Sequence, residues 1–74
     1  MEYHLWIEGF KRQGMHCEAI YYRRIGGDSF IDACTQWAQH RAMDPKAYEI
    51  IRGVPYYGRS RRFDNQAEAR KSFG

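Results

Sequence analysis

Cysteine, proline and long apolar runs are all scarce in this chain of 74 residues. Its two cysteines cannot build the dense disulfide framework that stabilises small secreted proteins. No apolar stretch is long enough for a signal peptide or a membrane-spanning helix. The sequence therefore predicts a single soluble, intracellular domain that spans residues 1–74.

A strong excess of charge of one sign is also missing. Twelve Lys and Arg residues oppose nine Asp and Glu residues, and the net charge of +3 is too small to indicate a nucleic-acid partner by itself. Nine of the twelve cations are arginines, which stack on rings and bind phosphate or carboxylate with two hydrogen bonds. Aromatic residues make up 16% of the chain, more than so small a core can bury. We expect several rings at the surface.

The clearest pattern is a helical one over residues 27–42. Ser29 is placed to cap the helix, and Asp32 can reach back to the same end. Pro45 ends it, because the residue before a proline is pushed out of the α region. The face that recurs with helical spacing, and around which the rest of the chain must pack, consists of Phe30, Ala33, Cys34, Trp37 and Ala38.

A strand is predicted over residues 2–10, before this helix. Its alternation sends Leu5 and Ile7 to the core and Trp6 to the other face. Residues 11–16 are polar and contain a glycine, which favours a hairpin loop.

The second predicted strand covers residues 17–25, and its alternation is imperfect. Strict alternation would direct Tyr21 and Ile25 to the core and Ile20 and Tyr22 to the opposite face. Both faces therefore carry apolar bulk, and the second face needs a cover or a partner.

Two further strands and a short helix are predicted after the central helix. Residues 48–52 are rich in strand-forming residues, and residues 56–63 are their predicted antiparallel partner. Gly58 and the arginines around it argue for an edge strand or a bulge rather than a central strand. Asn65 and Glu68 have the spacing of a capping box, so a last helix follows, docked through Ala69 and Phe73.

These elements predict an α+β fold in the order β-β-α-β-β-α. The sheet is antiparallel, with three or four strands, and the main helix covers one face. The core beneath the helix is expected to contain Leu5, Ile7, Tyr21, Ile50 and Phe63. The other face is expected to present some of Trp6, Ile20, Tyr22 and Tyr57.

Residues with catalytic or metal-binding chemistry are few and unfavourably spaced. His16 and Cys17 are adjacent, but neighbours in a strand point to opposite faces, and no second ligand pair has the spacing of a zinc site. Cys34 lies on the apolar helix face, where a free cysteine is usually a small buried hydrophobe. We therefore predict a protein that is not an enzyme, with no catalytic residue, no metal site and no cofactor.

The most specific feature is a tyrosine- and arginine-rich stretch, residues 52–62, with four arginines and no acid. Rings interleaved with arginine can stack bases and neutralise phosphates. The same residue types dominate the hot spots of protein interfaces. The structural alternative is an edge strand that its charges protect from aggregation. The predicted binding residues are Trp6, Tyr22, Arg52, Tyr56, Tyr57, Arg59, Arg61 and Arg62.

Acidic residues elsewhere suggest a molecule with opposed charged faces. Such polarity suits docking to a protein or nucleoprotein better than tracking a phosphate backbone, which prefers a continuous basic surface. The acids that can form the negative region are Glu2, Glu8, Asp32, Asp44 and Glu49.

Residues 63–74 (FDNQAEARKSFG), 6–9 (WIEG) and 27–33 (GDSFIDA) give the chain a compact layout. In size, composition and layout, the whole chain resembles small phage-encoded accessory proteins, a group that includes the anti-CRISPR inhibitors. The resemblance implies a non-enzymatic protein in the cytoplasm of a bacterial host that binds and blocks a defence complex there. It implies no functional residue, because the group shares no common site.

Two functions are therefore expected. The favoured one is an inhibitor that docks on a host nucleoprotein complex, similar to CRISPR-Cas, through an aromatic and arginine surface. The alternative is a module that binds single-stranded nucleic acid and uses the tyrosine- and arginine-rich stretch as its platform. No membrane partner is expected.

Overall fold

Seven strands and two α-helices occur in the part of the chain that the computed structural model describes, residues 1–12 and 15–71. Side chains are described outside residues 10–17 and 71. The predicted α+β class with an antiparallel sheet is confirmed, but four strands, not two, precede the first helix. In order, the elements are β1 (Glu2–Ile7), β2 (Phe10–Arg12), β3 (Met15–Cys17), β4 (Ile20–Gly26), α1 (Phe30–His40), the 3₁₀ turn η1 (Pro45–Ala47), β5 (Tyr48–Ile51), β6 (Val54–Tyr57), β7 (Ser60–Phe63) and α2 (Gln66–Lys71).

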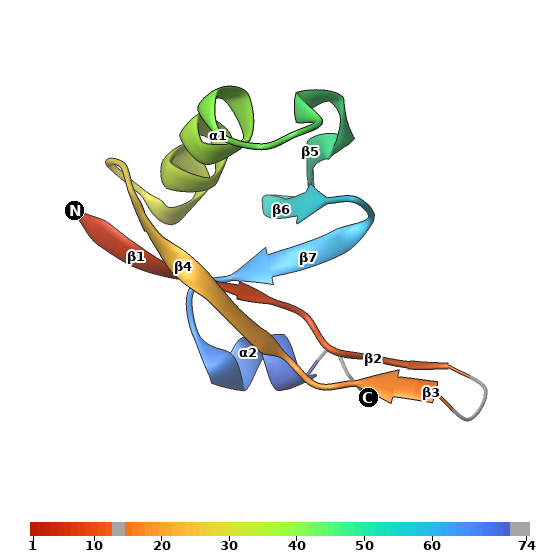
Figure 1. Ribbon diagram of the computed structural model, residues 1–74. Helices are drawn as coiled ribbons and strands as arrows, with labels where there is room; N and C mark the ends of the chain where they lie inside the picture. The colour runs from red at the N-terminus through yellow and green to blue at the C-terminus, as the bar shows by residue number, and fades with distance from the viewer. Residues whose placement is uncertain (13–14, 72–74) are drawn as a thin grey trace.

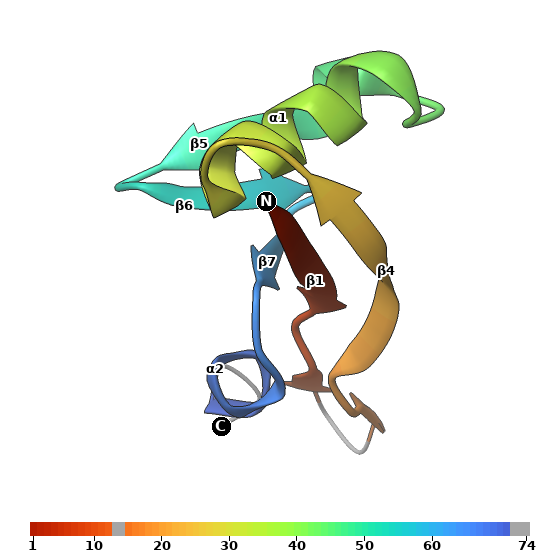
Figure 2. The ribbon, with the colours of Figure 1, turned by 90° about the vertical axis from the view of Figure 1, so that its left-hand side faces the viewer.

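The main sheet has five antiparallel strands in the order β4-β1-β7-β6-β5. Helix α1 packs against β1, β4 and β6, and α2 packs against β7 and β1. The two helices lie on opposite sides of the β1 and β7 strands (Figures 1 and 2). The polar loop predicted over residues 11–16 is wrong in extent, because β2 and β3 pair there as a separate two-stranded ribbon.

Strand β7 lies in the middle of the sheet, which contradicts the edge position expected from its glycine and arginines. The predicted strand over residues 56–63 is divided by a two-residue turn at Gly58 and Arg59, both with positive φ (58° and 68°). Arg52 and Gly53 form a similar turn before β6, with φ values of 52° and 78°. Such turns match the twist of the strands and permit tight hairpins. The chain therefore passes from β5 through β6 to β7 as a tight meander.

Helix α1 begins as its sequence predicts. The Ser29 hydroxyl accepts a hydrogen bond from the Asp32 backbone N–H at 3.0 Å, and the Asp32 carboxylate accepts one from the Asp28 N–H at 2.9 Å. The approach of α1 to β4 depends on Gly27, because a Cβ there would lie 2.6 Å from the Ala33 backbone nitrogen. The short turn after β4 therefore sets how closely α1 packs on the sheet.

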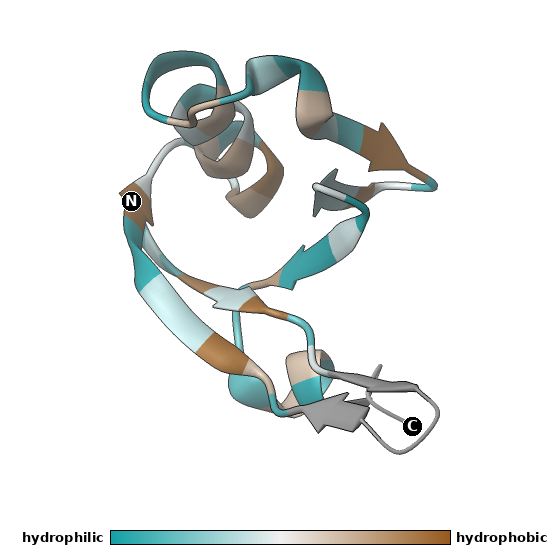
Figure 3. Cartoon of the chain, turned by 45° about the vertical axis from the view of Figure 1, so that its right-hand side comes forward, coloured by the Kyte–Doolittle hydropathy of each residue, from teal (hydrophilic) through white to brown (hydrophobic). Residues whose placement is uncertain are grey.

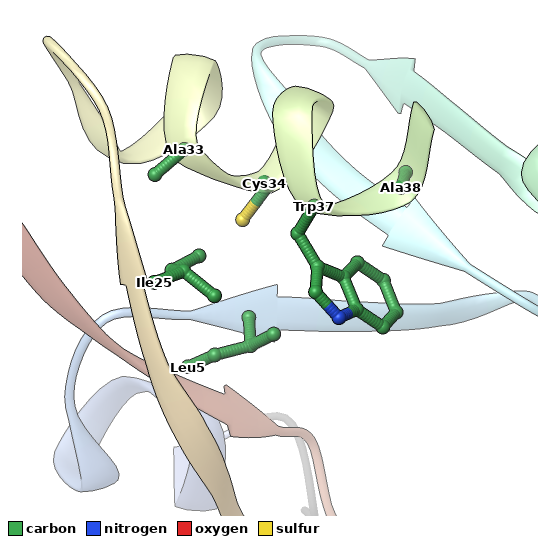
Figure 4. Close-up of a cluster of buried hydrophobic side chains, with 6 residues drawn as sticks. All are labelled: Leu5, Ile25, Ala33, Cys34, Trp37 and Ala38. Atoms are coloured by element: carbon green, nitrogen blue, oxygen red, sulfur yellow. The ribbon is translucent and has the colours of Figure 1, made fainter. Parts of the chain in front are cut away.

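The core lies between α1 and the β1–β4 pair (Figure 4). Leu5 is buried as predicted, and Ile7 is half-buried. The core cluster consists of Leu5, Ile25, Ala33, Cys34, Trp37 and Ala38. The predicted helix face is therefore confirmed as the face that organises the core.

Tyr21 and Tyr22 occupy faces opposite to those predicted. Between Leu5 and Trp6 the β1–β4 register shifts, since Leu5 pairs with Arg23 and Trp6 pairs with Tyr21. Tyr22 is the extra residue of this bulge, and its ring packs on Trp37 with centroids 5.7 Å apart. A bulge changes which face the following side chains reach, so Tyr21 contacts Trp6 on the far face instead of entering the core.

Two other core predictions are wrong. Ile50 is 47% exposed on β5, at the edge of the sheet, and Figure 3 shows the arrowhead end of this strand as strongly hydrophobic. Phe63 is half-buried but pairs with Trp6, which places it on the face away from α1. The sheet thus leaves apolar surface on β5 that no described element covers.

Helix α2 begins at the predicted cap, where the Asn65 side chain accepts a hydrogen bond from the Glu68 backbone N–H at 2.8 Å. Ala69 is fully buried, as expected for the docking residue, and its carbonyl accepts a hydrogen bond from the Gly9 N–H. Phe73 lies outside the described residues. No helix within residues 1–12 and 15–71 has the length and hydropathy needed to cross a bilayer.

Candidate functional site: a basic groove beside helix α1

The tyrosine- and arginine-rich stretch does not form one surface. Arg61 lies on the face away from α1, where its guanidinium donates to both oxygens of Glu8 at 3.1–3.3 Å and its backbone N–H donates to the same carboxylate. These bonds raise the pKa of Arg61 above its ordinary value. Tyr56 pairs with Arg61 in the neighbouring strand. A guanidinium held in this way is already neutralised by the protein's own carboxylate.

The other predicted binding residues are divided between the turns and the two faces. Arg52 and Arg59 are exposed in the two tight turns. Trp6 lies on the face away from α1, with its ring 5.3 Å from that of Tyr21. The α1 side of the sheet carries Tyr22, Tyr57 and Arg62. The expectation that Tyr22 and Tyr57 lie on the face opposite the helix is therefore wrong, since both rings contact Trp37.

A basic groove runs between β4 and the C-terminal half of α1. Its volume is about 290 Å³, and Ile25, Gly26, Ala33, Gln36 and Trp37 form its floor and walls. We call it the basic groove after three of its lining residues, Arg23, His40 and Arg41; the fourth, Arg24, pairs with His4, which places its side chain on the face away from α1. Among the described residues, no acidic side chain lines it.

The charge of this groove is only weakly neutralised. Arg24 lies 3.6 Å from the Glu2 carboxylate, but both side chains are about 70% exposed, and such pairs are weak in water. His40 and Arg41 also suit the negative end of the α1 dipole, which is a structural reason for their presence. An anion that enters the groove would nevertheless be attracted by its cations, and no acidic side chain among the described lining residues would repel it.

An aromatic pocket of about 230 Å³ adjoins the groove and shares Trp37 and Arg41 with it. The centroid of the Trp37 ring lies 5.7 Å from that of Tyr22 and 5.0 Å from that of Tyr57, both edge to face. We call it the aromatic pocket, and its lining is Ile7, Tyr22, Trp37, Arg41, Ala42, Met43, Tyr57 and Arg62.

Arg62 is the unusual member of this pocket, because it is a buried cation with 8% of its surface exposed. One terminal nitrogen donates to the Ser60 carbonyl at 3.2 Å, and the guanidinium lies 5.6 Å from the centre of the Tyr57 ring. Within the described part of the chain it forms no ion pair, and its Nε has no hydrogen-bond partner. Burial lowers its pKa from the ordinary value.

Cys34 does not neutralise this cation. The thiol is buried, and burial raises its pKa from 9.0 to about 12, despite the opposing attraction of Arg62. At neutral pH it is a protonated, apolar group without the thiolate that nucleophilic chemistry requires. Its predicted role as a small buried hydrophobe is confirmed.

Residues able to bind a metal ion do not gather in the described part of the chain. The described residues contain no cluster of three or more His, Cys, Asp or Glu side chains able to hold a metal ion. The side chains of His16 and Cys17, whose pairing the sequence raised, lie outside the described set.

Little in the amino-acid sequence indicated the basic groove. Arg23 and Arg24 end a strand, His40 and Arg41 end a helix, and each pair taken alone looks like an ordinary polar terminus. The only available signal was the short Gly26–Gly27 connection, because a tight turn brings the preceding strand back along the helix that follows.

No family model matches this chain, and no curated protein and no solved structure shows significant similarity to it. The function must therefore be argued from the groove and the pocket themselves.

Proposed function

We propose that this protein acts by binding rather than by catalysis, and that its basic groove binds single-stranded nucleic acid. The observation that carries the proposal is a groove lined by Arg23, His40 and Arg41, with no acidic side chain of the described residues in its lining. Phosphates are the most common ligands of such arginine clusters, because a planar guanidinium donates two parallel hydrogen bonds to them.

The adjoining aromatic pocket favours a single strand over a duplex. A duplex hides the faces of its bases in the stack, whereas a single strand can turn a base out toward an aromatic side chain. Tyr22, Trp37 and Tyr57 stand directly beside the basic groove. Phosphates in the groove and a base in the pocket are therefore compatible with one bound strand.

Fluorescence anisotropy with labelled single-stranded DNA and RNA at low salt tests this proposal. We expect binding whose affinity falls with salt at a logarithmic slope of about −1.4, the value for two engaged arginines at about −0.7 per phosphate. An Arg23→Ala and Arg41→Ala double variant should bind at least about tenfold more weakly, because it loses two phosphate contacts.

A matched control removes the same charge elsewhere. The Arg52→Ala and Arg59→Ala double variant loses two exposed turn arginines, which lie outside the groove lining. It should retain most of the affinity. If the turn variant loses binding and the groove variant does not, the tyrosine- and arginine-rich stretch is the site and the groove is not.

A second candidate function is a phage-type inhibitor that docks on a host defence nucleoprotein complex. The observation that favours it is the apolar edge strand β5, where Ile50 is 47% and Ile51 42% exposed. Exposed apolar side chains on a sheet edge are typical of protein-binding surfaces. A protein that ignores free oligonucleotides but captures such a complex, and loses it in an Ile50→Lys variant, would support this candidate over the first.

A further inference from the structure

We infer that the aromatic pocket is a binding site for one unstacked guanine base, read by the guanidinium of Arg62. The inference deepens the proposed function and rests on it, because the base would belong to the strand held in the basic groove. Three observations carry it: an unpartnered buried cation, a wall of aromatic rings, and a cationic surface at the pocket mouth.

The buried cation is the first observation. Arg62 is more than nine-tenths buried and lines the pocket, and no acidic group of the described residues pairs with it. An uncompensated buried charge is costly, and acceptor atoms supplied by a ligand would reduce that cost. One terminal nitrogen already donates to the Ser60 carbonyl, but the Nε–H is without an acceptor among the residues described. The Nε atom is itself enclosed by the protein, so a ligand in the pocket would meet the guanidinium at its terminal nitrogens.

The shape of the pocket is the second observation. At about 230 Å³ it is smaller than the roughly 300–1,000 Å³ of pockets that enclose whole drug-sized ligands. A single flat ring system suits this size. Its walls include Tyr22, Trp37 and Tyr57, and aromatic rings receive bases by stacking or by edge contact.

The choice of guanine follows from the hydrogen-bonding geometry of arginine. A guanidinium donates two parallel bonds, and two of the four unpaired DNA bases offer a matching pair of acceptors on one edge, guanine through O6 and N7 and cytosine through N3 and O2. Adenine presents a donor beside N7, and thymine presents a methyl group beside its acceptor. An arginine at the wall of a base pocket therefore favours guanine and cytosine over adenine and thymine, and the larger ring system of guanine gains more from stacking on the aromatic walls.

The mouth of the pocket is the third observation, because it places the phosphates. Arg41 lines both the pocket and the basic groove, next to Trp37. A nucleotide with its base in the pocket would direct its phosphates toward Arg41 and onward to Arg23. The candidate base site therefore adjoins the candidate phosphate site directly.

The test compares the affinity of the protein for a nine-residue oligothymidine with that for the same strand carrying one central guanine. We expect the guanine strand to bind about five- to a hundredfold more tightly, the range for a good bidentate contact. Replacing that guanine by 7-deazaguanine removes N7 and should abolish most of the gain. Replacing it by hypoxanthine keeps O6 and N7 and should preserve the gain. An RNA series of the same design shows whether ribose changes the preference.

Two protein variants complete the test. Arg62→Lys keeps the positive charge but loses the planar pair of donors, so it should bind oligothymidine within about twofold of the parent and lose the guanine preference. Tyr22→Ala removes an aromatic wall that is 48% exposed and should reduce the preference without unfolding the protein. Arg52→Lys, at an exposed turn away from the pocket, is the matched control and should change nothing.

The outcomes separate this inference from the proposed function. Binding to oligothymidine with no gain from guanine overturns the base site alone, and so does a preference that survives intact in Arg62→Lys. Failure to bind any strand overturns both. The protein could instead show no guanine preference and bind a polyglutamate peptide through Arg62. That result would overturn the base site and identify the pocket as a carboxylate site. If Arg62→Lys does not fold, the 7-deazaguanine and hypoxanthine strands still decide the result on the unaltered protein.

Discussion

Arg61 and Arg62 are consecutive residues of β7, and they have opposite environments. Arg61 points to the face away from α1, where the Glu8 carboxylate binds its guanidinium and its backbone N–H. Arg62 points to the α1 face, where it is buried beside Tyr57 with no ion pair in the described part of the chain. The protein itself supplies the partner of Arg61, whereas Arg62 can take its partner from a ligand.

The difference shows that residue type alone does not identify a binding residue. Because successive residues of a strand point to opposite faces, two neighbouring side chains of the same type lie in two different environments. The functional question is which of the two the protein has already satisfied. The predictions below test the two faces of β7 separately, beginning with the change that disturbs the α1 face most.

Trp37→Ala should remove the main aromatic support of the α1 face. We expect a loss of about 3–5 kcal/mol in the free energy of unfolding, since the indole is buried and contacts the rings of Tyr22 and Tyr57. A chain of this size has only about 4–11 kcal/mol in total, so most of the stability would be lost. Urea denaturation followed by circular dichroism measures this. A variant that unfolds like the parent would remove α1 from its organising role.

Gly27→Ala should disturb the same face by a different route. A Cβ at this position would lie 2.6 Å from the Ala33 backbone nitrogen, so α1 must move away from β4. We expect a loss of about 1–3 kcal/mol from this overpacking, measured by thermal unfolding. Gly26→Ala is the control, because its nearest contact is 3.7 Å away and its stability should change little. Equal effects of the two variants would contradict the close packing at Gly27.

Glu8→Gln should affect only the opposite face. It removes the charge that pairs with Arg61, and we expect a loss of about 1–2 kcal/mol, because the Glu8 side chain is only 13% exposed and the Arg61 side chain 38%. Glu2→Gln breaks the exposed pair with Arg24 and should stay within about 0.5 kcal/mol of the parent. Chemical denaturation compares the two. If Glu8→Gln impaired oligonucleotide binding as strongly as a groove variant does, the separation of the two faces would fail.

The pH dependence of stability should report on Cys34, next to Arg62 on the α1 face. Burial raises the pKa of this thiol from 9.0 to about 12, so the folded state keeps a proton that the unfolded state loses above pH 9. Its contribution is complete below pH 9 and is lost as the pH rises toward 12, by about 1 kcal/mol between pH 9 and pH 10. The measurement compares Cys17→Ser with the Cys17→Ser and Cys34→Ala double variant. A constant difference between them over this range would contradict the burial of the thiol.

Local patterns in the sequence were sufficient for both helices and their caps. The helical spacing around Cys34 and Trp37, the Ser29 cap and the Asn65 cap all depend on residues within one or two turns of each other. Strand order could not be predicted, because it depends on which distant segments pair. The arginines of β7 favoured an edge strand only because the partner of Arg61, Glu8, is 53 residues away.

The candidate site was predicted least well, and one extra residue in β4 is the main reason. The bulge at Tyr22 reverses the faces that alternation assigns to Tyr21 and Tyr22, and no residue type in the sequence marks it. Tyr22 and Arg62 were among the predicted binding residues, but the structure places both on the α1 side, apart from Arg61. Arg23, His40 and Arg41 come together only through the packing of β4 on α1.

The central position of β7 has a consequence for how the protein is made. During synthesis β1 and β4 leave the ribosome early and can pair as a ribbon, but the end of β1 at Trp6 and Ile7 lacks its second partner strand until β7 emerges. Contacts between such distant segments form late and slowly, and an unpaired strand edge can recruit another chain in the meantime. Glu8 lies just beyond the end of β1, so its charge discourages wrong pairing there until Arg61 arrives to neutralise it.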